Sequence, residues 1–147
     1  MATRANIMIT SDWKNFASAY CHWDGGLWCV GGMLEEHYND TDTIMDLVAL
    51  GNMSSLKETV EETATDEKNV YKEQGGQVEM KDATELSIAS CGEEYLYVWD
   101  AKQEKWFVGT YYTPNWRSLK VAVQEFLAEV PEKTIFSEDY TVYGMAA

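Results

Sequence analysis

The sequence predicts an α+β protein in which an antiparallel β-sheet of two hairpins packs against two to four helices. Two stretches have the β-prone, turn-separated pattern of hairpins, and other stretches place apolar residues at the three- and four-residue spacings of helices. The chain of 147 residues is 46% hydrophobic, which is enough for one core. We therefore expect residues 1–147 to form a single domain.

The first hairpin is expected at residues 5–10 and 16–22. Residues 5–10 alternate, with Ile7 and Ile9 on one face, and residues 11–15 between the two runs are turn-like. A glycine-bearing loop begins at Asp24 and leads into a predicted helix. The apolar stripe of that helix follows the i, i+3, i+4, i+7, i+8 pattern and comprises Val30, Met33, Leu34, His37 and Tyr38.

A second helix is expected to begin near Thr43, which forms a capping-box pattern with Asp46, and to end at Gly51. Its buried face would comprise Ile44, Leu47 and Val48. Ser55 and Glu58 suggest a third, shorter helix. Residues 57–82 are polar and acidic without an apolar stripe, so we expect a mobile or peripheral segment there.

The second half of the chain contains the second predicted hairpin and the clearest predicted helix. Residues 95–100 and 105–112 are aromatic-rich runs separated by a turn at 101–104. After Pro114, a helix ending at Pro131 is predicted by the spacing of Trp116, Leu119, Val123, Phe126, Leu127 and Val130. A last strand is expected around residues 134–143.

Composition restricts the classes of partner. With 25 Asp and Glu against 11 Lys and Arg, the formal charge of −14 repels phosphate backbones, so direct nucleic-acid binding is disfavoured. Three cysteines without zinc-type spacing indicate reduced thiols, no disulfides and no metal site. Residues 1–9 do not form a signal peptide and no stretch approaches the length of a membrane span. We expect a bacterial cytoplasmic protein without a membrane partner.

The segment 20–26 is the leading candidate for the functional surface. If the strand continues through it, His22 and Asp24 point to the same face and either bind a polar ligand or pin the turn by a mutual hydrogen bond. Cys21 then points the other way. Neighbours on a strand cannot hydrogen-bond side chain to side chain, so a Cys21–His22 nucleophilic pair is excluded.

The glycine-rich loop at residues 25–32 has the spacing of a phosphate-binding loop. A nucleoside triphosphatase needs Lys and Ser or Thr at its end, where this chain has Gly32 and Met33, so that class is excluded. Two readings remain open: bare N–H groups that bind an anion, or glycines that allow a tight turn and close packing.

Several of these motifs also resemble those of a group of small bacteriophage and prophage proteins. The resemblance is carried best by the first sixty residues, in the motifs Thr3-Arg4-Ala5-Asn6, Tyr20-x-His22-Trp23-Asp24-Gly25, Val30-Gly31, Leu34 and His37-Tyr38. It implies a phage accessory protein in a bacterial cytoplasm. Such proteins often counter host immunity by sequestering nucleotide signals, by imitating DNA or by blocking a defence protein.

The leading functional hypothesis is a non-enzymatic counter-defence protein that sequesters a small polar ligand such as a cyclic signalling nucleotide. In it Trp23 or Trp28 stacks on a base, His22 and Asp24 hydrogen-bond the ligand, and loop N–H groups take a phosphate. The full predicted site comprises Arg4, Tyr20, His22, Trp23, Asp24, Gly25, Gly26 and Trp28. No catalytic residue, cofactor or metal is expected, and homo-oligomerisation is left open.

Two alternatives belong to other classes. An acidic inhibitor would imitate DNA to block a host defence nuclease or CRISPR-type complex, since carboxylates can stand where a target expects phosphates. Its predicted surface comprises Glu58, Glu61, Glu62, Asp66 and Glu67. A small hydrolase that uses His22 and Asp24 as acid and base is the third hypothesis.

Overall fold

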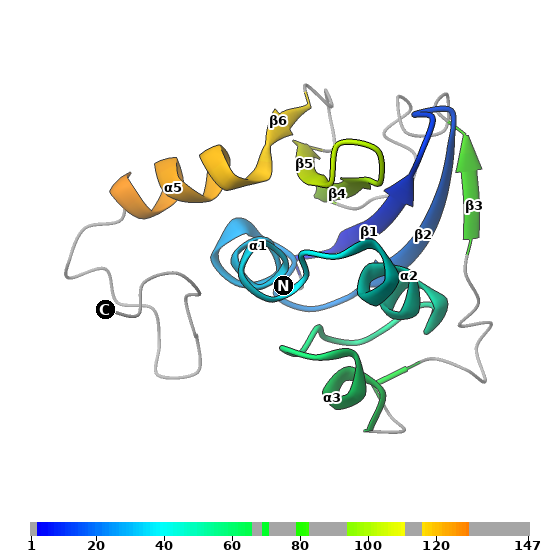
Figure 1. The fold of residues 1–147 in the computed structure, drawn as a ribbon. Helices are drawn as coiled ribbons and strands as arrows, with labels where there is room; N and C mark the ends of the chain where they lie inside the picture. Colours follow the sequence, from blue (N-terminus) through cyan, green and yellow to red (C-terminus); the bar gives the residue numbers. More distant parts are fainter. Residues whose placement is uncertain (1–2, 66–68, 71–78, 83–93, 111–115, 130–147) are drawn as a thin grey trace.

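The computed structural model describes residues 3–65, 69–70, 79–82, 94–110 and 116–129, and these form a mixed sheet with helices packed against it (Figure 1). The strands are β1 (Ala5–Thr10), β2 (Asn15–Cys21), β3 (Glu79–Asp82), β4 (Tyr95–Asp100), β5 (Lys105–Thr110) and β6 (Arg117–Ser118). The helices are the π-helix η1 (Leu27–Gly31), α1 (Gly32–His37), α2 (Thr41–Ala49), α3 (Val60–Thr65) and α5 (Leu119–Glu129). The α+β prediction is confirmed.

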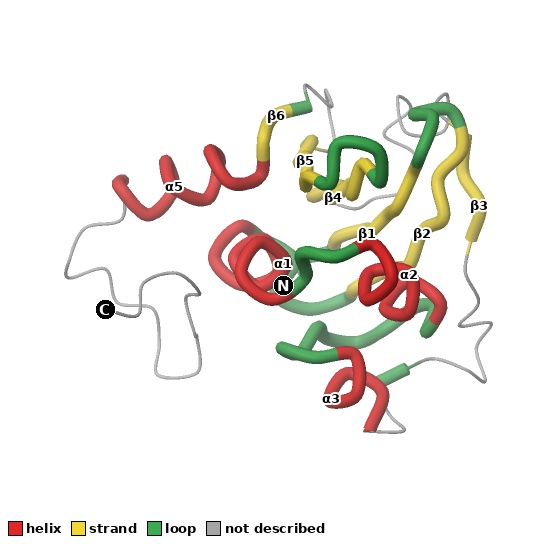
Figure 2. The backbone as a smooth tube through the Cα atoms, in the orientation of Figure 1, coloured by secondary structure: helices red, strands yellow, loops and turns green. Residues whose placement is uncertain are grey.

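Both predicted hairpins are present at the expected places. β1 pairs antiparallel with β2, and β4 pairs antiparallel with β5. The sheet order is β3-β2-β1-β4-β5-β6, so the first strand of each hairpin lies at the centre (Figure 2). Those two strands run in the same direction and pair in parallel, with Ala5 opposite Tyr95 and Thr10 opposite Asp100. The sheet is therefore mostly antiparallel, with one parallel pair that the sequence did not predict.

Successive side chains of the strands point alternately into two apolar layers, one on each face of the sheet. The main core lies between one face of the sheet and the helices, and includes Ile7, Cys21, Tyr97 and Trp99. A smaller cluster on the opposite face comprises Met8, Phe16, Leu96 and Val98, with Trp13 and Trp116 packed against it. Residues on β4 are buried on both faces, which explains why that strand lacks polar alternation.

The helices differ from the sequence prediction in their starts. The first helix begins as a π-helix at Leu27 before continuing as α1. The N-cap of α2 is Asp40, whose side chain accepts hydrogen bonds from the N–H groups of Asp42 and Thr43. Thr43 therefore lies inside the helix. The predicted end is correct, because Gly51 adopts a φ of 82° just after it.

The third helix and the C-terminal helix complete the described part of the chain. α3 begins at Val60, later than Ser55 suggested, and α5 buries Leu119, Ala122 and Val123 against the main core. The predicted strand at 134–143 and part of the polar segment 57–82 lie outside the described residues. The described parts of that segment contain α3 and the edge strand β3, which pairs with β2. Within the described part, none of the helices has the length and apolar character that crossing a membrane requires.

Candidate functional site

The strand β2 ends at Cys21, before the residues predicted to share its face. The N–H of His22 then donates to the carbonyl oxygen of Met53 at 3.1 Å, and the N–H of Trp23 donates to that of Ser54 at 2.8 Å. Asp24 adopts a φ of 56°. The chain has therefore left the strand conformation, and the geometry that would place His22 and Asp24 side by side is not formed.

The hydrogen-bond partner of the His22 imidazole is Tyr20. The Tyr20 Oη and His22 Nδ1 atoms are 2.6 Å apart. The donor and acceptor roles of these two atoms depend on the tautomer of the imidazole. In the neutral tautomer that carries its proton on Nε2, the phenol donates to Nδ1 and the Nε2–H group can donate to a ligand.

Trp23 completes this part of the surface. Its side chain is 47% exposed, and its ring meets the His22 ring edge-on, with centroids 4.6 Å apart at 86°. An exposed indole is costly to leave in water and offers a face on which a planar ligand can stack. Tyr20, His22 and Trp23 are referred to below as the Tyr20–Trp23 surface.

The neighbouring thiols are packing groups. Cys21 is fully buried, and burial together with the nearby Cys29 raises the pKa of its thiol to about 12. Burial raises the pKa of Cys29 to about 11, with Asp24 adding to the shift. Thiols with such pKa values are protonated at neutral pH and are poor nucleophiles. The geometry agrees with the assignment of Cys21 to the core.

Two N–H groups of the glycine loop are hydrogen-bonded within the protein. The N–H of Gly25 donates to the carbonyl oxygen of Thr3 at 2.8 Å, and that of Gly31 donates to the carbonyl oxygen of Gly26 at 3.1 Å. The Gly25 carbonyl oxygen accepts the hydroxyl of buried Tyr97 at 2.6 Å. These bonds tie the loop to the start of β1 and to β4.

Close packing explains why glycine stands at this turn. A Cβ on Gly25 would lie 2.8 Å from both the Ala5 Cβ and the Thr3 carbonyl oxygen. A Cβ on Gly26 would lie 2.1 Å from the Trp28 ring. Both glycines are buried, so of the two readings of the loop the structure supports the packing one.

Trp28 lies away from the Tyr20–Trp23 surface. Its ring packs edge-on against Tyr95 and near Phe126 of α5, on the helix-covered side of the sheet. Arg4 is partly buried and directly precedes Ala5, which pairs with Cys21 at the end of β2. Of the predicted site residues, Tyr20, His22 and Trp23 are linked to one another by side-chain contacts.

A polar pair that the sequence analysis did not select lies beside this surface. Asn6 is opposite Tyr20 in the β1–β2 register, and the Ser18 hydroxyl donates to Asn6 Oδ1 at 3.2 Å. Asn6 is 2% exposed and its Nδ2 has no hydrogen-bond partner. An unpaired buried donor costs about 1–3 kcal/mol. The sequence feature that could have identified Asn6 is an amide side chain inside a predicted strand, next to apolar residues.

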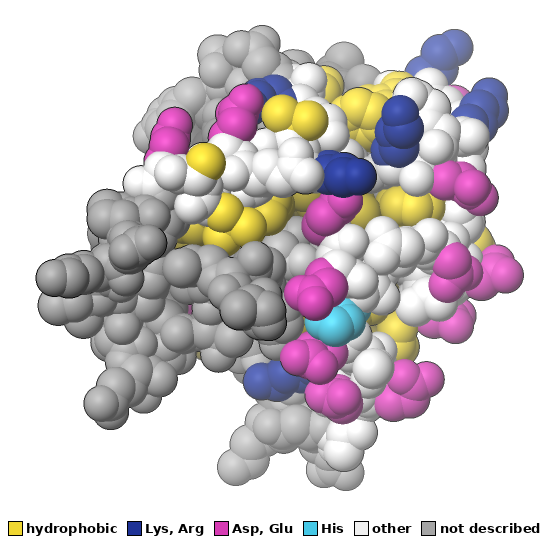
Figure 3. Space-filling model, turned by 60° about the vertical axis from the view of Figure 1, so that its left-hand side comes forward, with side chains coloured by type: hydrophobic (Ala, Val, Ile, Leu, Met, Phe, Trp, Pro, Cys, Tyr) yellow, Lys and Arg dark blue, Asp and Glu magenta, His cyan; other side chains and the backbone are white. Residues whose placement is uncertain are grey.

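The acidic alternative surface is only partly described. Glu58, Glu61 and Glu62 are exposed at the start of α3, whereas Asp66 and Glu67 lie outside the described residues. Figure 3 shows that many Asp and Glu side chains gather in the lower and right-hand part of one face, whereas most Lys and Arg side chains in that view stand higher.

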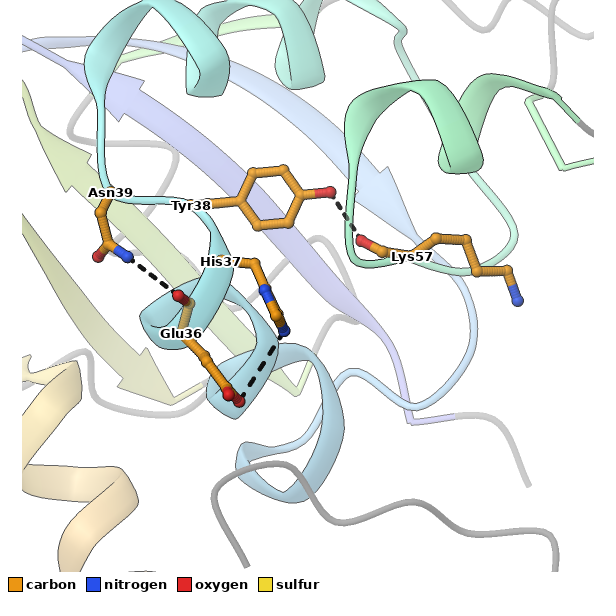
Figure 4. Close-up of polar contacts among 5 residues, drawn as sticks. All are labelled: Glu36, His37, Tyr38, Asn39 and Lys57. Atoms are coloured by element: carbon orange, nitrogen blue, oxygen red, sulfur yellow. Dashed lines mark hydrogen bonds and ion pairs between the residues drawn. The ribbon is translucent and has the colours of Figure 1, made fainter. Parts of the chain in front are cut away.

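The end of α1 corrects one further prediction. Tyr38 points into the core and its hydroxyl donates to the Lys57 carbonyl oxygen at 2.7 Å (Figure 4). His37 instead lies at the surface, with its Nε2 3.9 Å from a Glu36 carboxylate oxygen. His37 therefore does not belong to the apolar stripe, and Tyr38 alone carries the stripe to the end of the helix.

Comparisons with known proteins and a search for metal-binding groups add no further assignment. Among the described residues, no three His, Cys, Asp or Glu side chains form a group that could hold a metal ion. Comparison with protein-family models, with curated proteins and with solved structures found no match. The fold places the chain in the class of α+β proteins with a mixed sheet.

Proposed function

We propose that this protein is a non-enzymatic binder that holds a small polar ligand, a nucleotide, on the Tyr20–Trp23 surface. The observation that carries the proposal is the exposed Trp23 indole beside an imidazole oriented by Tyr20. A nucleobase that stacks on an aromatic side chain gains about 1–3 kcal/mol. His22 Nε2 supplies a directed hydrogen bond next to that stacking face.

The charge of the chain favours a single nucleotide over a polymer. A net charge of −14 repels a phosphate backbone along its whole length, whereas a free nucleotide carries only a few charges and is repelled less. Tyr20, His22 and Trp23 carry no carboxylate, so the surface itself does not oppose an anionic ligand. These features support a free nucleotide as the ligand class.

Binding without turnover is the activity we propose. His22 is hydrogen-bonded to Tyr20 rather than to Asp24, so the acid and base of the hydrolase hypothesis are not paired. The neighbouring Cys21 is buried and protonated at neutral pH. A nucleotide held by stacking and one imidazole is therefore sequestered rather than converted.

The biological role that we propose is sequestration of a nucleotide immune signal in a phage-infected bacterium. This role follows the resemblance of the Thr3–Asn6 and Tyr20–Gly25 motifs to small phage proteins. A protein that only binds can lower the free concentration of a signal if it is made in excess over it. The role requires no catalytic group.

Calorimetric titration with a panel of cyclic di- and trinucleotides tests the proposal. We expect saturable heat with at least one member of the panel and an unchanged ligand after incubation. A Glu58→Gln/Glu61→Gln/Glu62→Gln variant serves as the control, because these exposed carboxylates belong to the acidic alternative and their removal should not weaken binding. Flat heats across the panel would contradict the proposal.

A further inference from the structure

Two buried polar side chains lie on the sheet face opposite the main core, next to the Tyr20–Trp23 surface. Most of this face is apolar and comprises Met8, Phe16, Leu96 and Val98. Asn6 and Ser18 interrupt it, and they are 2% and 1% exposed. The register places Asn6 opposite Tyr20, so the Asn6–Ser18 pair lies directly beside the proposed ligand surface.

The hydrogen bonds within this pair leave one specific group without a partner. The Ser18 hydroxyl donates to Asn6 Oδ1 at 3.2 Å, and Asn6 Nδ2 has no acceptor. Turning the amide over would leave both the Ser18 hydroxyl proton and Asn6 Oδ1 without a partner. The observed orientation is therefore the better satisfied one, and the open group is a donor.

Retention of this donor is unfavourable unless something binds it. Met8, the next residue on this face of β1, and Leu96, opposite Asn6 on β4, contain no side-chain acceptor, and the amide nitrogen is shielded from solvent without a hydrogen-bond partner. An apolar residue of similar shape would avoid the unpaired amide. Groups that are unsatisfied in the free protein are expected where a ligand will satisfy them.

We propose that Asn6 is a specificity-determining residue whose Nδ2 donates to a carbonyl oxygen of the nucleobase bound at the Tyr20–Trp23 surface. This inference rests on the proposed function. Asn6 Nδ2 is a donor, and so is His22 Nε2 in the tautomer that accepts from Tyr20, so the matching base edge presents acceptors. Guanine offers acceptors at O6 and N7, whereas adenine carries an amino donor at the same place as O6. The ligand class is therefore an oxopurine nucleotide.

Contact between the base and Asn6 requires a movement of Tyr20. Asn6 is 2% exposed, and Tyr20 is its cross-strand neighbour on the same face. The Tyr20 hydroxyl is bonded to His22, so a displacement of the Tyr20 ring also changes the imidazole that contacts the ligand. Entry of the base therefore moves Tyr20 and His22 together, with the hydrogen bond that orients the imidazole retained.

The test compares cyclic di-GMP with cyclic di-AMP by calorimetry on the full chain. The wild type is expected to bind cyclic di-GMP about tenfold more tightly or better, the usual effect of one well-placed hydrogen bond. An Asn6→Leu/Ser18→Ala double variant removes the donor and its partner together. It should lose the guanine preference while its midpoint of urea unfolding stays the same or rises.

The outcomes separate this inference from the proposed function. A wild type that binds both compounds equally, or prefers cyclic di-AMP, overturns the inference even if the double variant does not fold. A double variant that keeps the guanine preference also overturns it, and the proposed function then still stands. A wild type that binds neither compound overturns the inference, whereas binding of other panel members would leave the proposed function intact.

Discussion

At the scale of single residues, the site depends on contacts that connect distant parts of the sequence. His22 and Trp23 leave the strand because their N–H groups bond to Met53 and Ser54. No local sequence pattern predicts that pairing. The segment could therefore be predicted as functional, whereas the relative positions of His22 and Asp24 could not be predicted. Asn6 was missed for a similar reason, because its contact with Ser18 and its unpaired amide nitrogen appear only when β1 and β2 pair.

Replacement of Gly25 by Ala should destabilise the protein by about 1–3 kcal/mol, the usual cost of overpacking a rigid core. The added Cβ would meet the Thr3 carbonyl oxygen and the Ala5 Cβ at 2.8 Å. The free energy of urea unfolding measures the effect. Gly31→Ala is the matched control and should be milder, because its nearest contacts are side-chain atoms at 3.2 Å and beyond.

Equal stability of the two glycine variants would contradict the account of this turn. It would indicate that the N-terminal segment moves aside easily and does not tie the loop to the sheet. Binding is then expected to change as well, because Thr3 and Gly25 anchor the chain just after the Tyr20–Trp23 surface.

At the scale of elements, the sequence predicted the hairpins and the long C-terminal helix because each is defined by local periodicity. The parallel pairing of β1 with β4 depends on how two finished hairpins meet, and the chain between them holds the helices. The cap of α2 was assigned to Thr43 because Thr and Asp satisfy the same pattern. In the structure the N-cap is Asp40, which lies three residues before Thr43.

Removal of the α2 cap should cost about 1 kcal/mol in the free energy of unfolding. Asp40 accepts the N–H groups of Asp42 and Thr43, and an Asp40→Ala variant would leave these donors to water. Asp42→Ala is the control, because Asp42 is exposed in the first turn and contributes only through the helix dipole. A larger loss of stability for Asp42→Ala than for Asp40→Ala would contradict the assignment of the cap to Asp40.

The β1–β2 turn should make the stability of the protein sensitive to acid. Hydrogen bonds from the N–H groups of Asn15 and Lys14 lower the pKa of Asp12 from 3.8 to about 2. Because the folded pKa lies below the unfolded one, this contribution is fully present above about pH 4 and is lost as the pH falls toward 2. Urea unfolding at a series of pH values should show a smaller acid-induced loss for Asp12→Asn than for the wild type.

The matching turn between β4 and β5 provides a check on that interpretation. Burial alone would raise the pKa of Asp100, but hydrogen bonds from Trp13, Gln103 and the Lys102 N–H lower it overall. Asp100→Asn should therefore also reduce the acid-induced loss. If both variants lose as much stability in acid as the wild type does, these turn carboxylates do not cause the acid sensitivity.

At the scale of the whole molecule, charge determines how the proposed ligand approaches. The chain carries a net charge of −14, so an anionic nucleotide is repelled before it reaches the Tyr20–Trp23 surface. Salt screens this repulsion. Raising the salt concentration from about 0.02 M to about 0.2 M should strengthen binding of a cyclic dinucleotide in calorimetric titrations, because the screening length shortens severalfold over this range.

This salt dependence is opposite to that of a protein that binds phosphates through Lys and Arg, which weakens as salt rises. Binding that weakens with salt would therefore place the ligand at a cationic site elsewhere on the molecule. The same titration with an uncharged nucleoside should be insensitive to salt and serves as the control.

The most direct test of the central claim is calorimetric titration of Trp23→Ala beside Met45→Ala. Both side chains are among the exposed large hydrophobic ones, at 47% and 54%, so neither truncation should unfold the protein. With the panel member that the wild type binds best, the account predicts a loss of about tenfold or more for Trp23→Ala and no change for Met45→Ala. Wild-type affinity in the Trp23→Ala variant would contradict it.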